Sequence, residues 1–489
     1  MSKSEVQTEN IEPKIDPKDV TSVTKHTIKI NGKTIKYKAT CGTVVLREEH
    51  DKEGEALEAK PRASMFFVAY TLEGVRDPAK RALTFSFNGG PGSSSVWLHL
   101  GLFGPKRVRL DDEGNAGAPP QQLVDNEFSV LDKTDLVFID PIGTGYSRMI
   151  SGEKVKEFHD YKRDLESVGE FIRLYTSRNE RWASPKYIAG ESYGTTRACG
   201  LAGLLQEKHG MYMNGLILIS CALDFQTLRF DHGNDLPPVL FLPTYAATAW
   251  HHKALAPAEQ KRKLADLLKE VEMFAAGRYT AALFKGASLS AKERAEIIDQ
   301  LVRFTGLSRE YIEATNLRIN IHRFCKELLR ARGLTVGRLD SRFKNQDRDN
   351  AGEMFEFDPS HANLIGAFSG ALNDYVRREL KFENDLPYKT LSGLYMTWGW
   401  NEFANRYANV SETLRKAMRM NPHLKVYVGS GYFDLATPHF ATDYTFNHLN
   451  IDAVRAKDIT THYYEAGHMM YIHKPSLAAM AKDMRAFIG

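Results

Sequence analysis

The segment KYIAGESYG, residues 186–194, decides the fold of this chain. A short apolar run ends at a serine between two glycines, and SYGTTRACGLAGLLQEKHG then continues with helical periodicity. The flanking glycines permit the sharp turn that holds Ser192 exposed in a strained conformation. The pattern G-x-S-x-G in this setting predicts a strand–turn–helix that presents a nucleophile, and the alternative is an ordinary glycine-rich turn.

Strand-like and helix-like segments alternate on both sides of this turn. Residues 26–47 alternate around Asn31-Gly32, which is a strong signal for a β-hairpin. Further β-rich runs cover residues 63–74, 83–90, 135–141, 186–190 and 214–220. Amphipathic stretches at residues 158–178 and 192–210 lie between them. The alternation predicts an α/β fold whose sheet is mostly parallel, with helices on both faces.

The pattern changes after about residue 223. Helical periodicity dominates to about residue 390, for example at residues 256–284, 290–304 and 321–333, and β and α signals resume at residues 423–434 and 458–471. We therefore expect an α/β core of residues 23–223 and 391–489, split by a mainly helical insertion of residues 224–390. An insertion near the catalytic edge would form a lid or a pocket wall. The polar residues 1–22 are expected to be a disordered leader.

Composition excludes several classes of protein. The 489 residues are 43% hydrophobic and 26% charged, with a formal net charge of +4, as in globular domains without a nucleic-acid footprint. No apolar run reaches the length of a membrane span, so no membrane partner is expected. The absence of an apolar leader favours the cytoplasm, although a removed signal would allow a periplasmic or secreted protein. Oligomeric state is left open.

The cysteines and histidines do not suggest a metal site. Four cysteines, Cys41, Cys199, Cys221 and Cys325, occur at no CxxC-type spacing, and buried free thiols are the expectation. The pair His251-His252 has no carboxylate or cysteine at ligand spacing. No metal and no organic cofactor are expected.

A serine nucleophile needs a base that a third group holds in one tautomer. When the serine lies on such a turn, an acid and then a histidine follow it in the chain, on loops after late strands. Asp434 follows KVYVGSGYF, and His468 follows ITTHYYEAG. The rivals are less suitable: His462 lies within its strand, His473 opens the last helix, and Asp443 belongs to a helix interior.

Acyl transfer also needs hydrogen-bond donors for the oxyanion. One is expected to be the amide of Tyr193, directly after the serine. FNGGPGSSS, residues 87–95, follows an earlier strand, and its glycines let backbone amides approach a ligand, so we expect Gly90 N–H to be the second donor. The alternative for this loop is a structural bulge or tight turn.

Five segments in order, NGGPGSSS, DPIGTGYS, GESYG, the Asp434 segment and GHM, resemble the serine carboxypeptidases. The resemblance runs from about residue 65 to the C-terminus and implies an α/β-hydrolase fold with a helical insertion. It implies the triad Ser192, Asp434 and His468 and the oxyanion amides of Gly90 and Tyr193. It also implies that Asn88, the backbone of Gly89, and Glu191 bind the free C-terminal carboxylate of a peptide.

The role of Glu191 has a physical basis as well. An ionised glutamate would repel a substrate carboxylate, so the two groups should share a proton. Binding would then weaken as the pH rises, so KM would be lowest under acid conditions. The alternative is that Glu191 only packs or hydrogen-bonds within the turn.

Other positions are departures or open cases. Ser93 and Thr437 stand where the resemblance leads one to expect cysteines, which removes the implied disulfide at Ser93. Met469 matches a methionine of the family's leaving-group pocket, and the alternative is a core methionine. In GRLDSRF, residues 337–343, the alternating charges would either shape the substrate mouth or form a solvated ion-pair ladder.

The prediction is a serine-type carboxypeptidase that releases C-terminal amino acids from peptides through an acyl-enzyme. Its expected partners are peptides with a free C-terminus. One alternative is an acyltransferase or esterase on the same scaffold, and another is a non-catalytic binding module.

Overall fold

The structure is a computed structural model that describes residues 17–50 and 58–489. The first sixteen residues of the expected leader lie outside the described residues. β1 begins at Val20 and pairs with β2, so the expectation of a leader extending to residue 22 is wrong at its end. Within the described residues, no helix has the length and apolar content that crossing a membrane requires.

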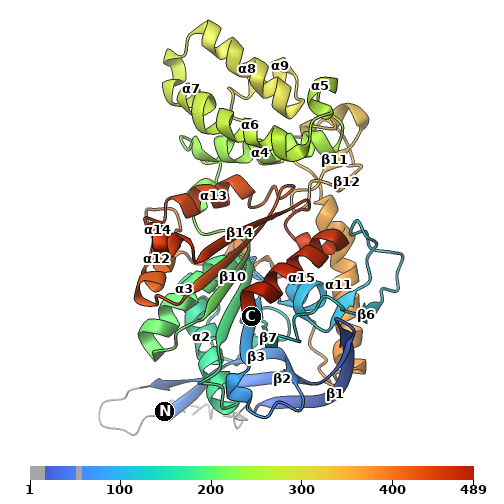
Figure 1. Cartoon of the computed structure of the whole chain (residues 1–489), viewed down its shortest axis with the longest axis vertical. Helices are drawn as coiled ribbons and strands as arrows, with labels where there is room; N and C mark the ends of the chain where they lie inside the picture. Colours follow the sequence, from blue (N-terminus) through green and yellow to red (C-terminus); the bar gives the residue numbers. More distant parts are fainter. Residues whose placement is uncertain (1–16, 51–57) are drawn as a thin grey trace, which may run out of the picture.

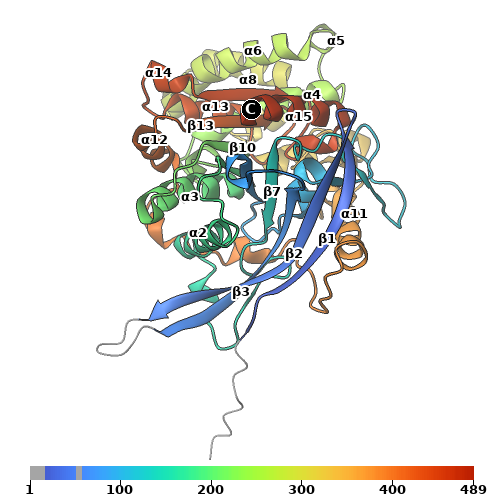
Figure 2. The same ribbon diagram turned by 60° about the horizontal axis from the view of Figure 1, so that its bottom comes forward.

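A ten-stranded sheet forms the centre of the molecule, in the order β1-β2-β3-β7-β4-β9-β10-β13-β14, with β8 paired to β3. The first four strands of this order are antiparallel neighbours, and β7 through β14 are parallel. The bounds are β1 (Val20–Ile30), β2 (Lys33–His50), β3 (Glu58–Leu72), β4 (Ala82–Phe87), β7 (Thr134–Ile139), β8 (Arg148–Met149), β9 (Lys186–Ser192), β10 (Gly215–Cys221), β13 (Lys425–Gly431) and β14 (Ile459–Tyr464). Figure 2 shows β1, β2 and β3 as long strands that extend past the helical layers.

The hairpin predicted at Asn31-Gly32 is confirmed. Ile30 pairs with Lys33 across a two-residue turn whose residues have φ of 49° and 78°. Asparagine and glycine tolerate these left-handed conformations, and such a turn matches the twist of the flanking strands.

Helices cover both faces of the sheet because successive strand residues point to opposite sides. Leu216 and Leu218 of β10 pack in one apolar cluster, and Ile217 and Ile219 pack in another. The first cluster includes α2 (Tyr161–Arg178), α3 (Tyr193–His209) and α12 (Ser411–Met420). The second includes α1 (Val96–Leu98), the π-helical η2 (His99–Phe103), α11 (Pro359–Arg378) and α15 (Lys474–Ile488).

A third apolar cluster is formed mainly by the helices between β10 and α11. Figure 1 shows α4, α6, α7, α8 and α9 gathered at one end of the molecule, away from α2, α3 and α15. The stretch 256–284, expected to be helical, is divided by a π-helical turn. The bounds are α4 (Leu236–His251), α5 (Pro257–Gln260), α6 (Leu264–Phe274), η5 (Ala275–Tyr279), α7 (Thr280–Lys285), α8 (Ala291–Thr305), α9 (Arg309–Ala314) and α10 (Ile321–Glu327). α11 lies within the expected insertion of residues 224–390 but packs in the apolar cluster on one face of the sheet. The boundaries at residues 224 and 390 therefore stay a prediction.

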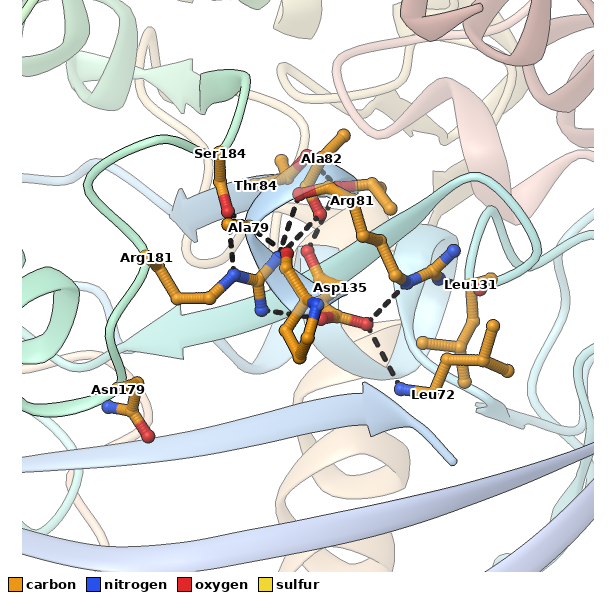
Figure 3. Close-up of polar contacts among 12 residues, drawn as sticks. Leu72, Ala79, Arg81, Ala82, Thr84, Leu131, Asp135, Asn179, Arg181 and Ser184 are labelled. Carbon is orange, nitrogen blue, oxygen red and sulfur yellow. Dashed lines mark hydrogen bonds and ion pairs between the residues drawn. The ribbon is translucent and has the colours of Figure 1, made fainter. Parts of the chain in front are cut away.

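The amino ends of β4 and β7 are joined by a buried ion-pair cluster (Figure 3). Asp135 lies between two guanidinium groups, 2.7 Å from Arg81 Nε and 2.6 Å from Arg181 Nη1. Arg181 also donates to the carbonyls of Arg81 and Ala82, which fixes the loop before β9 against the start of β4. The cluster holds the sheet at the edge opposite the carboxyl ends of its parallel strands.

Candidate active site

Ser192 ends β9, and α3 begins at the next residue, which confirms the predicted strand–turn–helix. Its φ of 60° and ψ of −130° are a strained conformation for a residue with a side chain, and the residue is partly exposed. A Cβ at Gly190 would lie 2.1 Å from the carbonyl oxygen of Gly194, so only glycine fits before the turn. The backbone therefore presents Ser192 at the carboxyl edge of the sheet.

Asp434 and His468 lie together at the same edge, after β13 and β14. His468 Nδ1 is 2.8 Å from Asp434 Oδ2, and both side chains are buried. The amides of Ala436 and Thr437 donate to Asp434 Oδ1, and the Thr437 hydroxyl donates to Oδ2 at 2.7 Å. A carboxylate held in this way accepts a hydrogen bond from Nδ1–H and leaves Nε2 of the imidazole as the proton acceptor. Burial alone would lower the pKa of His468, but the Asp434 charge and its hydrogen bond raise that pKa above its ordinary value.

The rival side chains have other contacts. His462 lies in β14, stacks on Tyr427 and is 3.3 Å from Asp483. His473 caps α15, and Asp443 lies within α13 (His439–Asn447). These placements agree with the predicted strand, cap and helix interior.

Two segments hold the backbone of His468. Its amide donates to Leu339 O at 2.6 Å, and its carbonyl accepts from Ser220 Oγ at 2.7 Å. Ser220 has a φ of 54° at an irregularity where β10 passes β9, so a strained residue at the end of one strand supports the loop after another.

The charged segment 337–343 supports the same loop. Asp340 Oδ2 accepts from the Gly467 amide at 3.1 Å and from Arg342 Nη2 at 2.7 Å. Asp340 and Arg342 are only 2% and 7% exposed, so the alternative of a solvated ion-pair ladder is wrong for these two side chains. A Cβ at Gly467 would lie 2.4 Å from Asp340, which explains the glycine of GHM. The segment positions the histidine loop.

Ser192 and the His468 loop are both connected to the end of β10. Cys221 of β10 pairs with Ser192, and the adjacent Ser220 holds the carbonyl of His468. Among the described residues, Ser192 Oγ makes no hydrogen bond. Catalytic hydrogen bonds are often long in the absence of substrate and tighten when it binds.

The loop after β4 packs directly on the turn at Ser192. A Cβ at Gly89 would lie 2.5 Å from Tyr193 N, so the two backbones touch with no side chain between them. Gly90 has a φ of 102°, a conformation that favours glycine. The loop thus packs Gly89 against the Tyr193 backbone, with Gly90 as the next residue, and the pair of oxyanion donors stays a prediction.

Asn88 and Glu191 form one hydrogen-bonded unit beside Ser192. Asn88 Nδ2 donates to Glu191 Oε1 at 2.8 Å, and Asn88 Oδ1 accepts from Leu98 N, which fixes the orientation of the amide. Tyr471 donates to Glu191 Oε2 at 2.6 Å. Glu191 is 4% exposed, and burial raises its pKa to about 7. The sequence analysis does not predict Tyr471 at this site. Its position three residues after His468 is the one feature that could have suggested it.

A second unexpected group lies behind this unit. Arg197 is 1% exposed, and its Nε donates to Asp164 Oδ2 at 2.8 Å while Nη1 donates to Asn88 O at 2.7 Å. The Tyr193 hydroxyl also donates to Asp164 Oδ2. One buried ion pair therefore fixes the backbone at Asn88 and the ring of Tyr193.

Met469, Ser93 and the four cysteines have contacts within the core of the molecule. Met469 is 4% exposed and belongs to the apolar cluster that includes α11 and α15, which favours the core alternative. Ser93 Oγ accepts from Trp97 Nε1 at 3.0 Å. The prediction of buried free thiols is confirmed for Cys41, Cys199, Cys221 and Cys325. In the described parts of the chain, no three histidine, cysteine or acidic side chains are grouped as metal ligands.

A mostly parallel sheet covered by helices, with a serine on the turn after β9, defines an α/β-hydrolase fold. The crystal structure of Kex1, a prohormone-processing carboxypeptidase of Saccharomyces cerevisiae, has the same fold, with a TM-score of 0.55 and 18% identity over 92% of this chain and 91% of that one. The family model described as serine carboxypeptidase matches residues 55–473. The chain belongs to the serine carboxypeptidase family.

Curated relatives match over shorter segments. Serine carboxypeptidase-like 34 of Arabidopsis thaliana is 24% identical over 205 residues, which are 40% of this chain and 36% of that protein. The pheromone-processing carboxypeptidase KEX1 of Debaryomyces hansenii is 33% identical over 134 residues, 26% of this chain and 17% of that protein. The chain thus covers about a third or less of these relatives' length.

Proposed function

We propose that this chain is a serine-type carboxypeptidase that releases single residues from peptide C-termini through an acyl-enzyme. The observation that carries the proposal is the buried Glu191 carboxyl, bonded to Asn88 directly beside Ser192. A neutral carboxyl group and an amide are donors suited to a substrate carboxylate. Membership of the serine carboxypeptidase family supports the same chemistry.

In the proposed reaction, Ser192 Oγ attacks the scissile carbonyl while His468 Nε2 takes its proton. Asp434 keeps the imidazole in the required tautomer and stabilises its charged form, which agrees with the raised pKa of His468. The amides of Gly90 and Tyr193 stabilise the oxyanion. The C–N bond breaks as His468 passes the proton to the leaving amine, and a water activated by His468 then hydrolyses the acyl-enzyme.

Carboxylate recognition requires a proton. Glu191 has a pKa of about 7 because it is buried, so it takes up a proton at neutral pH at small cost. Protonated Glu191, the Asn88 amide and the backbone of Gly89 would then bind the substrate carboxylate. Above neutral pH Glu191 ionises, and KM rises because two carboxylates repel each other.

The experiment compares N-blocked dipeptides that have a free or an amidated C-terminus. A carboxypeptidase cleaves the free acid with a much higher kcat/KM. Equal rates on both peptides would show that the carboxylate cradle, formed by Asn88, Gly89 and Glu191, does not bind a carboxylate, and would point to an esterase or endopeptidase. Adding an alcohol or amine nucleophile to an ester substrate measures how the acyl group partitions, and transfer in excess of hydrolysis would indicate an acyltransferase. Failure of an organophosphonate to label Ser192 would indicate a non-catalytic binding module.

A further inference from the structure

Tyr471 places a phenol hydroxyl against the candidate carboxylate cradle. It belongs to the short 3₁₀ helix η10 (Met470–Ile472), and its hydroxyl donates to Glu191 Oε2 at 2.6 Å. The ring is 2% exposed and fills a space that exists because residue 101 is a glycine: a Cβ there would lie 2.5 Å from the Tyr471 ring. The hydroxyl is therefore held at one position relative to Glu191.

The two oxygens of Glu191 differ in their partners. Oε1 accepts from Asn88 Nδ2, a group that only donates, and Oε2 accepts from Tyr471. Both hydrogen bonds stabilise the ionised form of Glu191 and lower its pKa, and they oppose the effect of burial. Of the two donors, Tyr471 is the one that is not expected to touch substrate.

The charges that act on Glu191 come from two other loops. The His468 cation, before η10, lowers the pKa of Glu191, and the Asp434 carboxylate, after β13, raises it. Both remain when the Tyr471 hydroxyl is removed. The hydroxyl can therefore be tested separately from the charged groups that surround the carboxyl.

We propose that Tyr471 is a positioning residue that sets the pH above which the chain loses affinity for peptide carboxylates. The inference rests on the proposed function. By donating to ionised Glu191, the hydroxyl makes uptake of the shared proton harder, so it moves the loss of binding toward neutral pH. The phenol thus confines efficient turnover to neutral and acid conditions.

The test is the KM of a free-acid dipeptide between pH 5.5 and 9.5 for wild type and Tyr471→Phe. Hydrogen bonds to a charged group are strong enough that losing one shifts the midpoint of the KM rise upward by about one pH unit. At pH 9 the variant then has a KM about tenfold lower than wild type, because each pH unit above the midpoint is a factor of ten. A merely structural tyrosine would give the opposite sign, with a higher KM.

Tyr187→Phe is the matched control, because it removes another buried tyrosine hydroxyl, one that donates to Ile488 O at the far end of the sheet. It should leave the midpoint unchanged. If Tyr471→Phe does not fold, 3-fluorotyrosine at position 471 retains the side chain as a stronger donor, and the midpoint should move downward. An unchanged midpoint in the folded variant would overturn the inference. A wild-type KM that is flat with pH, or equal for free and amidated peptides, would instead overturn the proposed function.

Discussion

Replacing Glu191 with glutamine tests the shared proton most directly. Glutamine has nearly the same shape and donates at every pH, so Glu191→Gln should bind a peptide carboxylate independently of pH. In wild type, KM should rise tenfold per pH unit above the pKa of Glu191. Because burial raises that pKa to about 7, KM at pH 9 should exceed its value at pH 5.5 by about 100-fold.

The assay measures KM for one N-blocked dipeptide from pH 5.5 to 9, with its amidated form as a second substrate. Glu191→Gln should hold KM within about a factor of two across the range, since no group in the cradle then titrates. Glu259→Gln is the control, a buried glutamate paired with Arg262 and Arg303 in the helical insertion, and its KM should follow wild type. Parallel KM curves for wild type and Glu191→Gln would refute the reasoning.

The same substitution has a substrate-free readout in stability. The pKa of Glu191 is raised from 4.5 in the unfolded chain to about 7 in the native protein, so the native state keeps this proton to a higher pH than the unfolded chain does. Wild-type stability should therefore fall by up to about 3 kcal/mol as the pH rises from 4.5 to 7, and the glutamine variant should lack this loss. Denaturant unfolding at pH 5 and pH 8 measures the difference, and equal changes in both proteins would contradict it.

Three further substitutions separate catalysis from stability. Ser192→Ala should lower kcat by at least about 10⁴-fold while circular dichroism and the thermal midpoint stay close to wild type; retained turnover would refute the nucleophile. Thr437→Val removes a donor to Asp434 Oδ2 and should lower kcat about tenfold with KM unchanged; a KM effect alone would mean that Thr437 acts on substrate binding. Asp135→Asn leaves Arg81 and Arg181 buried without their counter-charge and should lower the free energy of unfolding by about 3–5 kcal/mol, with an unchanged KM; full stability in urea unfolding would refute this role of the cluster.

The fold was predictable because its signals are local. The hairpin at Asn31-Gly32 requires left-handed residues, and the turn at Ser192 requires glycine at position 190, so short segments carry the information. The alternation of apolar strands and amphipathic helices predicted a sheet with helices on both faces. The Asp434–His468 contact was also predictable, because chain order and the ends of late strands restrict where an acid and a histidine can lie.

The supporting contacts were not predictable, because each joins residues far apart in the chain. Tyr471 and Glu191 are 280 positions apart, and Arg197 is 109 positions from the Asn88 carbonyl that it binds. No periodicity records such pairs, and a buried tyrosine or arginine in a helical pattern is indistinguishable from a packing or surface residue. The burial of Asp340 was not predictable for a related reason: alternating charge resembles a solvated face until burial is known.

The contacts of Asp340 change how the helical insertion relates to the chemistry. A segment that belongs to the expected insertion accepts hydrogen bonds from the amides of Gly467 and His468, through the Asp340 carboxylate and the Leu339 carbonyl. The loop of the candidate base is therefore held from one side by the end of β10, through Ser220, and from the other by the insertion. A small displacement of a catalytic group costs much of the rate. Movement of the 337–343 segment would therefore displace His468 and lower the rate even if the segment does not contact substrate. In the proposed reaction, the expected insertion would then act as part of the support for the base, in addition to any role as a lid.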